Sequence, residues 1–166
     1  MTGSSTSNTS FQHPLTLKIA AFLQQIGISV RQASLPDSTF LPGIHIEKGS
    51  ILIDESRLTY PGDLLHEAGH LAMMEPDRRA EATGDLEPGP GMAPDSLEMA
   101  AIAWSYAAAL HIGIDPAEVF HQEGYRGSSD NFLQNFREGR YVGVPVLAWR
   151  DMTTNEAYPA MSKWLV

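Results

Sequence analysis

Cysteine is absent from this chain of 166 residues. Its absence excludes disulfide bonds and thiolate metal ligands, so any metal ion held by the chain needs histidine or carboxylate ligands. Basic residues are also scarce: 11 Lys and Arg stand against 20 Asp and Glu, which gives a formal net charge of −9. Because that charge repels phosphate backbones and anionic lipid headgroups, we expect no nucleic acid and no membrane among the partners.

The chain also lacks an apolar run long enough to cross a bilayer, and it lacks a basic, then apolar, N-terminal signal. We therefore expect a soluble, cytoplasmic protein. Residues 2–10 are small and polar, which predicts a disordered tail over residues 1–10. The remaining residues 11–166 have the length and apolar content of a single globular domain, and neither an internal repeat nor a second domain is recognisable.

One motif, His66-Glu67-Ala68-Gly69-His70, combines residue types and spacing that suit a defined chemistry. Residues four apart lie on one face of a helix, so both imidazoles can bind one zinc ion while Glu67 lies beside them. Zinc lowers the pKa of a bound water from about 15.7 to about 7, which brings it within reach of a glutamate base. The pattern predicts a catalytic zinc site; the alternative is a pair of surface histidines beside an exposed glutamate.

The flanking sequence places this motif on a buried helix. Pro61 suits a first helical turn, apolar residues follow at helical spacing, and Pro76 is expected to end the helix.

A zinc site of this kind needs a third protein ligand, and no histidine or carboxylate downstream on the same helix is placed to supply it. Glu98, near the start of an alanine-rich helix predicted over residues 97–111, is the best candidate. The alternative is that Glu98 closes a capping box with Asp95 as N-cap. Glu81, Asp85 and Glu87 are the other candidates for the ligand.

The other elements follow from periodicity and turn residues. Helical spacing predicts a first helix from Pro14 that ends at Gly27, and Asp115-Pro116 is expected to begin a further helix. Alternation predicts a hairpin of residues 44–47 and 51–54, preceded by a short strand near residue 30. Residues 130–138 are predicted to form a short helix, and 141–147 are ambiguous between strand and loop because of Pro145. The expected fold class is α+β.

The hairpin, the helix with the histidines and the helix with Glu98-Met99-Ala100-Ala101 resemble the gluzincin zinc metallopeptidases, particularly the small bacterial domains of the ImmA/IrrE type. The resemblance covers about residues 15–113 and depends on one sharp motif. It implies a compact zincin-like peptidase core with His66, His70 and Glu98 as zinc ligands and Glu67 as general base. No aspartate follows Glu98 by four residues to orient a histidine ligand, so the groups behind the ligands are unassigned.

The resemblance also implies that the exposed sheet edge holds a peptide or protein substrate in an extended form; the alternative is a plain structural edge. Tyr125 and His121 are the first candidates to stabilise an oxyanion. Residues 76–95, rich in proline and glycine, are expected to form either a lid or a disordered connector, with Arg78 and Arg79 as contacts for a carboxylate. His45 is interpreted as an alternating strand residue.

The sequence thus predicts a zinc-dependent hydrolase that cleaves peptide bonds. One alternative is a regulatory or protein-binding module with the same fold and no activity of its own. A second is a metal hydrolase that acts on a small amide other than a peptide. The oligomeric state and the cleavage specificity do not follow from the residues.

Overall fold

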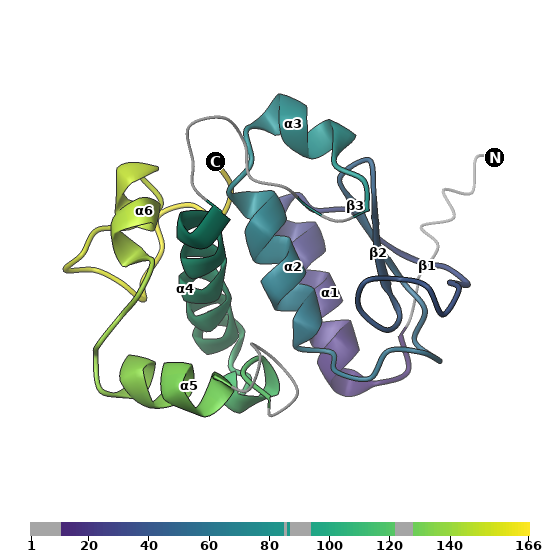
Figure 1. Cartoon of the computed structure of the whole chain (residues 1–166), viewed down its shortest axis with the longest axis horizontal. Helices are drawn as coiled ribbons and strands as arrows, with labels where there is room; N and C mark the ends of the chain where they lie inside the picture. The colour runs from purple at the N-terminus through teal and green to yellow at the C-terminus, as the bar shows by residue number, and fades with distance from the viewer. Residues whose placement is uncertain (1–10, 85, 87–93, 122–127) are drawn as a thin grey trace.

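The computed structural model describes residues 11–84, 86, 94–121 and 128–166. A small sheet lies at one side of the molecule, and α2 lies between this sheet and α4, with α1 behind (Figure 1). Along the chain the elements are α1 (Pro14–Ile26), β1 (Val30–Gln32), β2 (Ile44–Glu47), β3 (Ser50–Ile53), α2 (Asp63–Ala72), α3 (Pro76–Glu81), α4 (Pro94–Ile112), the 3₁₀ helix η1 (Pro116–Glu118), α5 (Ser129–Arg137) and α6 (Val144–Trp149). The predicted α+β class is confirmed.

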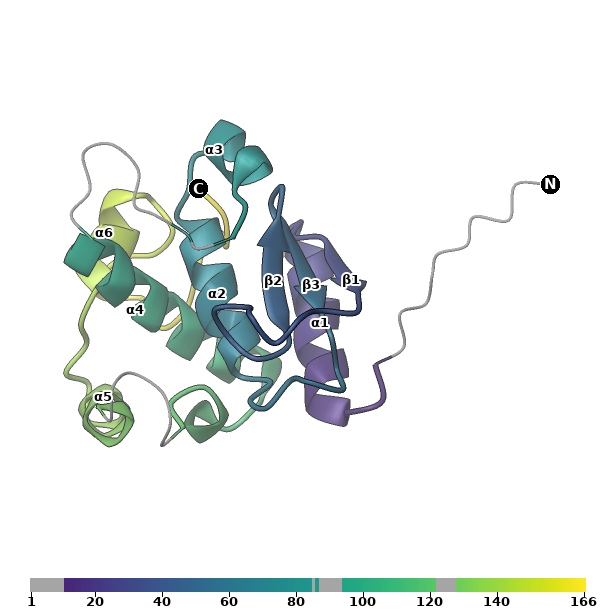
Figure 2. The same cartoon turned by 45° about the vertical axis from the view of Figure 1, so that its right-hand side comes forward.

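The sheet has three strands in the order β1-β3-β2, with β1 parallel and β2 antiparallel to β3. β2 and β3 form the predicted hairpin, but its loop is shorter than expected. Glu47 pairs with Ser50, and the two residues between them, Lys48 and Gly49, have φ angles of 47° and 77°. Positive φ at both central residues produces a type I′ turn, whose twist suits a two-residue hairpin. Because β2 stands at the end of the strand order, it is an edge strand of the sheet (Figure 2).

The first helix begins and ends where the sequence predicts. Pro14 occupies the first turn of α1, and Gly27 follows the helix in a left-handed conformation with φ 106°. Its N–H donates to carbonyls of the last turn, as a C-terminal glycine cap requires.

α4 is the central helix of the fold. From Ala100 to Ala109 every residue is at most 6% exposed, so this stretch is buried on all sides rather than along one stripe. α4 begins at Pro94 rather than at Leu97, which places Asp95 inside the first turn. The prediction that Asp95 is the N-cap of a capping box is therefore wrong. Gly113 ends the helix with φ 75°, as predicted.

Three further predictions are corrected. Pro76 does not directly end the histidine helix: α2 stops at Ala72, and Pro76 begins α3, so part of the predicted 76–95 loop is helical. The helix predicted from Asp115 is only the short η1, although Asp115 does cap it by accepting from the Ala117 N–H at 3.0 Å. Residues 144–149 form α6 rather than a strand or loop, because Pro145 occupies a first helical turn.

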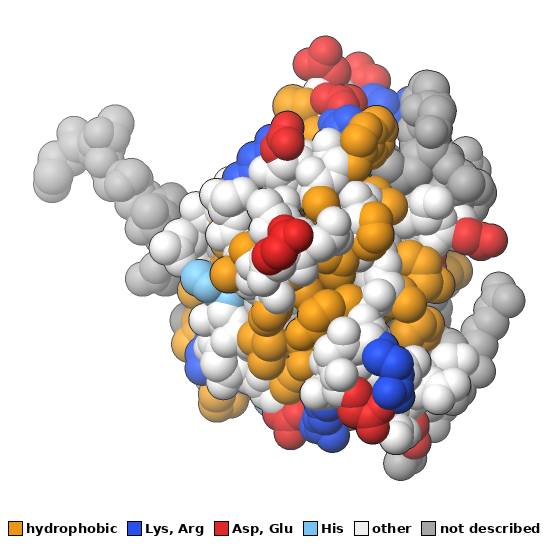
Figure 3. All heavy atoms as spheres, turned by 90° about the vertical axis from the view of Figure 1, so that its left-hand side faces the viewer, with side chains coloured by type: hydrophobic (Ala, Val, Ile, Leu, Met, Phe, Trp, Pro, Cys, Tyr) orange, Lys and Arg blue, Asp and Glu red, His pale blue; other side chains and the backbone are white. Residues whose placement is uncertain are grey.

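In Figure 1, α6 lies on the side of α4 that faces away from α2, and α5 lies below α4. On the left-hand side of this view, which Figure 3 shows face on, apolar side chains gather between scattered charges. Trp149 at the end of α6 is 68% exposed, with the Arg150 guanidinium 5.4 Å from its ring. Among the described residues, no helix is both long and apolar enough to cross a membrane.

Candidate metal centre

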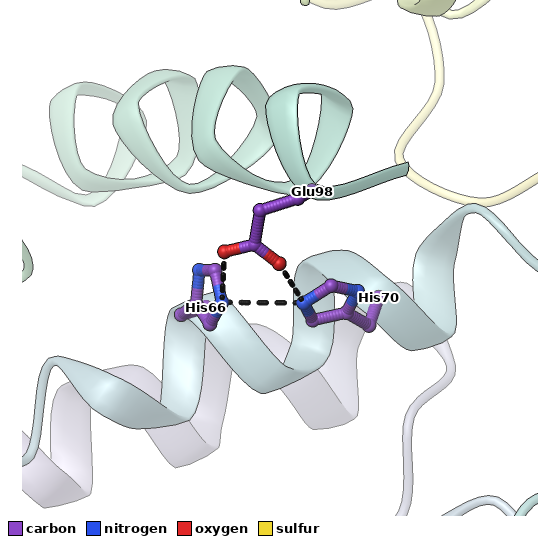
Figure 4. A group of neighbouring side chains, drawn as sticks. All are labelled: His66, His70 and Glu98. Atoms are coloured by element: carbon purple, nitrogen blue, oxygen red, sulfur yellow. Dashed lines mark hydrogen bonds and ion pairs between the residues drawn. The ribbon is translucent and has the colours of Figure 1, made fainter. Parts of the chain in front are cut away.

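The two histidines of the motif lie one helical turn apart on α2 and point the same way. Their side chains are 16% and 12% exposed, and their Nε2 atoms lie 3.2 Å apart (Figure 4). Leu64, Leu65 and Ala68 of the same helix are fully buried. The apolar face thus fixes the rotation of α2, and that rotation brings both imidazoles to the side facing α4.

Glu98 approaches the histidines from the first turns of α4. Its Oε1 lies 3.1 Å from Nε2 of His66, and its Oε2 lies 3.0 Å from Nε2 of His70. In the described part of the chain, these three residues form the one group of three or more His, Asp or Glu side chains that could hold a metal ion. Their ligand atoms all lie within 4.8 Å of one another. The structure therefore brings together the three predicted ligands, and Glu98 is bound to the histidines rather than to a helix end.

Glu98 can reach both histidines because α2 and α4 pack closely against each other. A Cβ added at Gly69 would lie 2.9 Å from the carbonyl oxygen of Ala101 and 3.3 Å from its Cβ. Helix axes come this close only where small residues meet. Gly69, between the two histidines in sequence, therefore sets the distance between α2 and α4.

The three side chains form a tightly coupled electrostatic group. Burial disfavours the charged form of Glu98, but hydrogen bonds and charge from His66 and His70 outweigh it and hold the pKa of this carboxyl well below its ordinary value of 4.5. Burial also disfavours the imidazolium of His66, yet its hydrogen bond to Glu98 and the charges of Glu98, Glu67 and Asp63 raise its pKa above 6.5. A concentrated negative charge thus faces the imidazoles, as a cation site requires.

The donor set itself fits zinc. Two imidazole nitrogens and one carboxylate oxygen are ligands that zinc accepts, and three protein ligands leave the open position that catalytic sites keep. The Nδ1 of His70 is buried without a hydrogen-bond partner among the described residues. Metal-bound histidines usually donate this N–H to an acceptor, so the site departs from the common arrangement there.

Glu67 lies next to the ligand group and also lines a cleft. It is half-buried and lines a cleft of about 330 Å³ together with β2 and the segment that precedes it. The residue next to the first ligand therefore connects the metal group to the edge of the sheet, which is the placement expected of a base that acts on a substrate.

The two predicted oxyanion-stabilising residues have different outcomes. Tyr125 lies outside the described residues. The ring of His121 stacks on Tyr60, with centroids 3.8 Å apart, and its Nε2 lies 2.7 Å from Asp63 Oδ1. His121 is therefore held at the start of α2, one turn before His66, and its role in catalysis stays a prediction.

Sequence reasoning missed Asp63. Burial raises the pKa of its carboxyl, while its hydrogen bond with His121 and the charges of His121 and His66 oppose the rise. A signal was present, because a residue three positions before His66 lies on the same helical face.

The remaining candidates lie elsewhere. Asp85 and Glu87 fall outside the described residues, while Glu81 is exposed at the end of α3. The guanidinium of Arg79, an expected contact for a carboxylate, donates to main-chain oxygens of Leu71, Met74 and Val166. His45 lies on β2 as predicted and is half-buried.

No family model matches this chain, and neither the curated proteins nor the solved structures include one that is significantly similar to it. The structure thus establishes a His-His-Glu group on α2 and α4 with the composition of a metal site.

Proposed function

We propose that this protein is a zinc-dependent hydrolase that cleaves peptide or closely related amide bonds, with a gluzincin-like site. The observation that carries the proposal is the convergence of His66, His70 and Glu98 from two helices, with Glu67 next to them at a cleft. Metal binding alone would not require a carboxylate beside the cleft. A hydrolase requires both the ligand group and a carboxylate that can act as a base.

Each residue has a defined role in this proposal. His66, His70 and Glu98 would hold the ion, which when bound lowers the pKa of a water molecule and polarises a carbonyl group. Glu67 takes a proton from the attacking water and passes it to the leaving amine. The half-buried position of Glu67 supports this role, because partial exclusion of water strengthens its interaction with a proton donor in the cleft.

Two observations favour a second candidate, a regulatory or protein-binding module without activity of its own. The Nδ1 of His70 lacks an acceptor among the described residues. His121, which the sequence nominates as an oxyanion donor, is engaged by Tyr60 and Asp63. Such a module would keep the ion as a structural element and bind its partner without cleaving it.

Exchange of Glu67 for Gln separates these functions. The Glu67→Gln variant should retain about one zinc per chain, since Glu67 is not a ligand, while cleavage of a peptide library falls by about a hundredfold or more, the usual contribution of a general base. Elemental analysis and mass spectrometry of the cleaved peptides provide the two readouts. Glu81→Gln, on the exposed end of α3, is the matched control and should retain both properties.

Two results would contradict the proposal. Wild-type rates in Glu67→Gln would remove the base assignment. If the zinc-loaded wild type cleaved no peptide or small amide, the protein-binding module would take the place of the enzyme.

A further inference from the structure

The edge of β2 beside Glu67 is largely occupied by the chain itself. Gly43 O accepts from Asp54 N–H at 2.9 Å, and Glu47 pairs with Ser50 across the turn. Because alternate residues of an antiparallel strand bond to opposite sides, Ile44 and Ile46 are the β2 residues whose backbone groups face outward. A peptide that added to this edge would have to pair with these two residues.

Both outward-facing residues already have partners. Ile44 forms an antiparallel bridge with Leu41, and its N–H donates to the Leu41 carbonyl at 3.2 Å. The Ile46 carbonyl accepts from the Gly84 N–H at 2.8 Å. Of the outward groups, the Ile44 carbonyl and the Ile46 N–H make no hydrogen bond to the described residues. An extended substrate therefore finds one acceptor and one donor, and the groups on either side of them, the Ile44 N–H and the Ile46 carbonyl, are already bonded.

The segment that covers the edge is held in place. We call residues 38–41 the arm; it lines the cleft opposite β2. Thr39 Oγ1 donates to the Leu41 carbonyl at 2.7 Å, and the Pro42-Gly43 turn returns the chain into β2. Gly43 has φ 74°, and a Cβ there would lie 2.5 Å from the Leu58 N atom, so the turn is fixed by the loop behind it.

The space left between the arm and β2 is small and mostly apolar. Its volume, about 330 Å³, is at the lower end of the range for sites that enclose small molecules. Phe40, Leu41, Ile44 and Ile46 contribute apolar lining; among the described lining residues Glu67 is the one carboxylate, and none is Lys or Arg. A substrate group with a negative charge would meet no fixed cation from these residues.

From these observations we infer that the cleft takes a short apolar amide of dipeptide size, whose carbonyl accepts from the Ile46 N–H, and that it excludes the interior of a longer polypeptide. This inference rests on the proposed hydrolase function and narrows its substrate class. The sequence left open whether this edge holds an extended substrate or is a plain structural edge. Under the inference the β2 edge offers a short ligand one donor and one acceptor, and it does not serve as a template for an extended chain.

A substrate series of increasing length tests the inference on the zinc-loaded wild type. Leucyl-leucine, its N-acetylated amide and a nonapeptide with Leu-Leu at its centre differ only in what flanks the same bond. We expect kcat/KM to fall by about tenfold or more from the N-acetylated amide to the nonapeptide, the factor expected when two net hydrogen bonds must break to admit the longer chain. Leucyl-leucine, which adds a charged amine and a carboxylate to the same short ligand, separates the effect of charged termini from the limit on length. Equal or faster cleavage of the nonapeptide would overturn the inference and leave the hydrolase function standing.

Binding provides a readout that does not depend on turnover. Calorimetry on zinc-loaded Glu67→Gln should show the N-acetylated leucyl-leucine amide binding more tightly than the nonapeptide. If neither ligand binds, or both bind equally, the inference is overturned. If binding depends on length but the wild type hydrolyses nothing, the proposed function fails while the substrate-size inference holds.

The arm supplies the decisive variant. Thr39→Val keeps the shape of the side chain but removes its bond to Leu41, so the ratio of dipeptide to nonapeptide kcat/KM should decrease. Thr59→Val, an exposed threonine outside the cleft, is the control and should leave the ratio unchanged. A ratio that stays the same in Thr39→Val would show that the arm does not set the length limit.

Discussion

Glu98 is the residue on which the ligand set depends most, because it is the one ligand that α2 does not supply. Its two oxygens lie 3.0 and 3.1 Å from the two histidines. Glu98→Ala should weaken zinc binding by about tenfold or more, since one of three protein ligands is lost. Competition with a chromogenic chelator measures the affinity, and Asp95→Ala, an exposed carboxylate on the same helix turn, should leave it unaltered. An unchanged affinity in Glu98→Ala would transfer the third ligand to another residue.

The charge coupling of His66 predicts how the stability of the metal-free protein depends on pH. A histidine with a raised pKa stabilises the fold fully below its unfolded value of 6.5 and loses that contribution as the pH rises through its folded pKa. The lowered pKa of Glu98 acts in the opposite direction: its contribution is present above 4.5 and is lost as the pH falls through the folded value. The pair therefore stabilises the metal-free fold most between these two ordinary values.

Thermal unfolding in the presence of a chelator checks this window. The difference in Tm between the wild type and His66→Gln should be larger at about pH 6 than at about pH 8.5, because the wild type loses the imidazolium over that interval. A difference that stays constant, or grows toward the higher pH, would contradict a raised pKa for His66.

The packing of α2 against α4 sets the geometry of the site at the level of elements. Gly69→Ala would place a Cβ 2.9 Å from the Ala101 carbonyl oxygen, so the helices must separate and Glu98 must move away from the histidines. We expect the free energy of unfolding to decrease by about 1–3 kcal/mol, as for other overpacked interiors, and zinc affinity to fall as well.

A control distinguishes this effect from general destabilisation. Gly113→Ala strains a left-handed residue at the far end of α4, about 22 Å along the helix from Glu98, and its Cβ would meet nothing closer than Lys18 Nζ at 3.7 Å. That variant should lose stability without losing zinc affinity. Comparable affinity losses in both variants, measured by titration with a chelator, would remove the special role of Gly69.

The sequence predicted those elements whose signals are local. α1 has a proline at its start and a glycine at its end, and the hairpin has alternating residues around a turn. α6 was missed because Pro145 was interpreted as an interruption of a strand, although proline is equally suited to a first helical turn. α3 was missed because Pro76 was interpreted as the end of the preceding helix, although it occupies the first turn of the next one. Proline marks a boundary, but it does not tell which side of the boundary is helical.

For the candidate site too, local sequence signals were predictable and contacts made only in the folded chain were not. His66, Glu67 and His70 were predictable because one helix fixes their spacing, and Glu98 because the metal needs a ligand that this helix lacks. The covered edge of β2 was not predictable, since it depends on contacts of Leu41 and Gly84 that only the folded chain forms. The interaction of Asp63 with His121, 58 residues apart, is likewise a product of tertiary structure.

At the scale of the whole molecule, the C-terminal segment completes the surroundings of α4. The indole Nε1 of Trp104 donates to the Trp164 carbonyl at 2.9 Å, and the Tyr158 hydroxyl donates to the Ala103 carbonyl at 2.7 Å. Trp104 and Tyr158 are themselves buried. The helix that carries Glu98 is therefore held by residues more than fifty positions further along the chain.

Removal of one of these bonds should destabilise the fold without altering the site. Tyr158→Phe loses the hydrogen bond to α4 and should decrease the free energy of unfolding by about 0.5–1.5 kcal/mol. Tyr141→Phe is the matched control, because the Tyr141 ring packs against Tyr158 at 4.6 Å but its hydroxyl makes no hydrogen bond to the described residues. Denaturant titration of both variants measures the difference, and equal stability would show that the hydroxyl contributes nothing.

The most direct test of the account is a structure of the zinc-soaked protein with anomalous data collected at the zinc edge, supported by elemental analysis. We predict one zinc per chain, bound by Nε2 of His66, Nε2 of His70 and a carboxylate oxygen of Glu98, with the remaining position open toward Glu67 and the cleft. An ion bound elsewhere, or no anomalous peak between α2 and α4 in zinc-soaked crystals, would contradict the account.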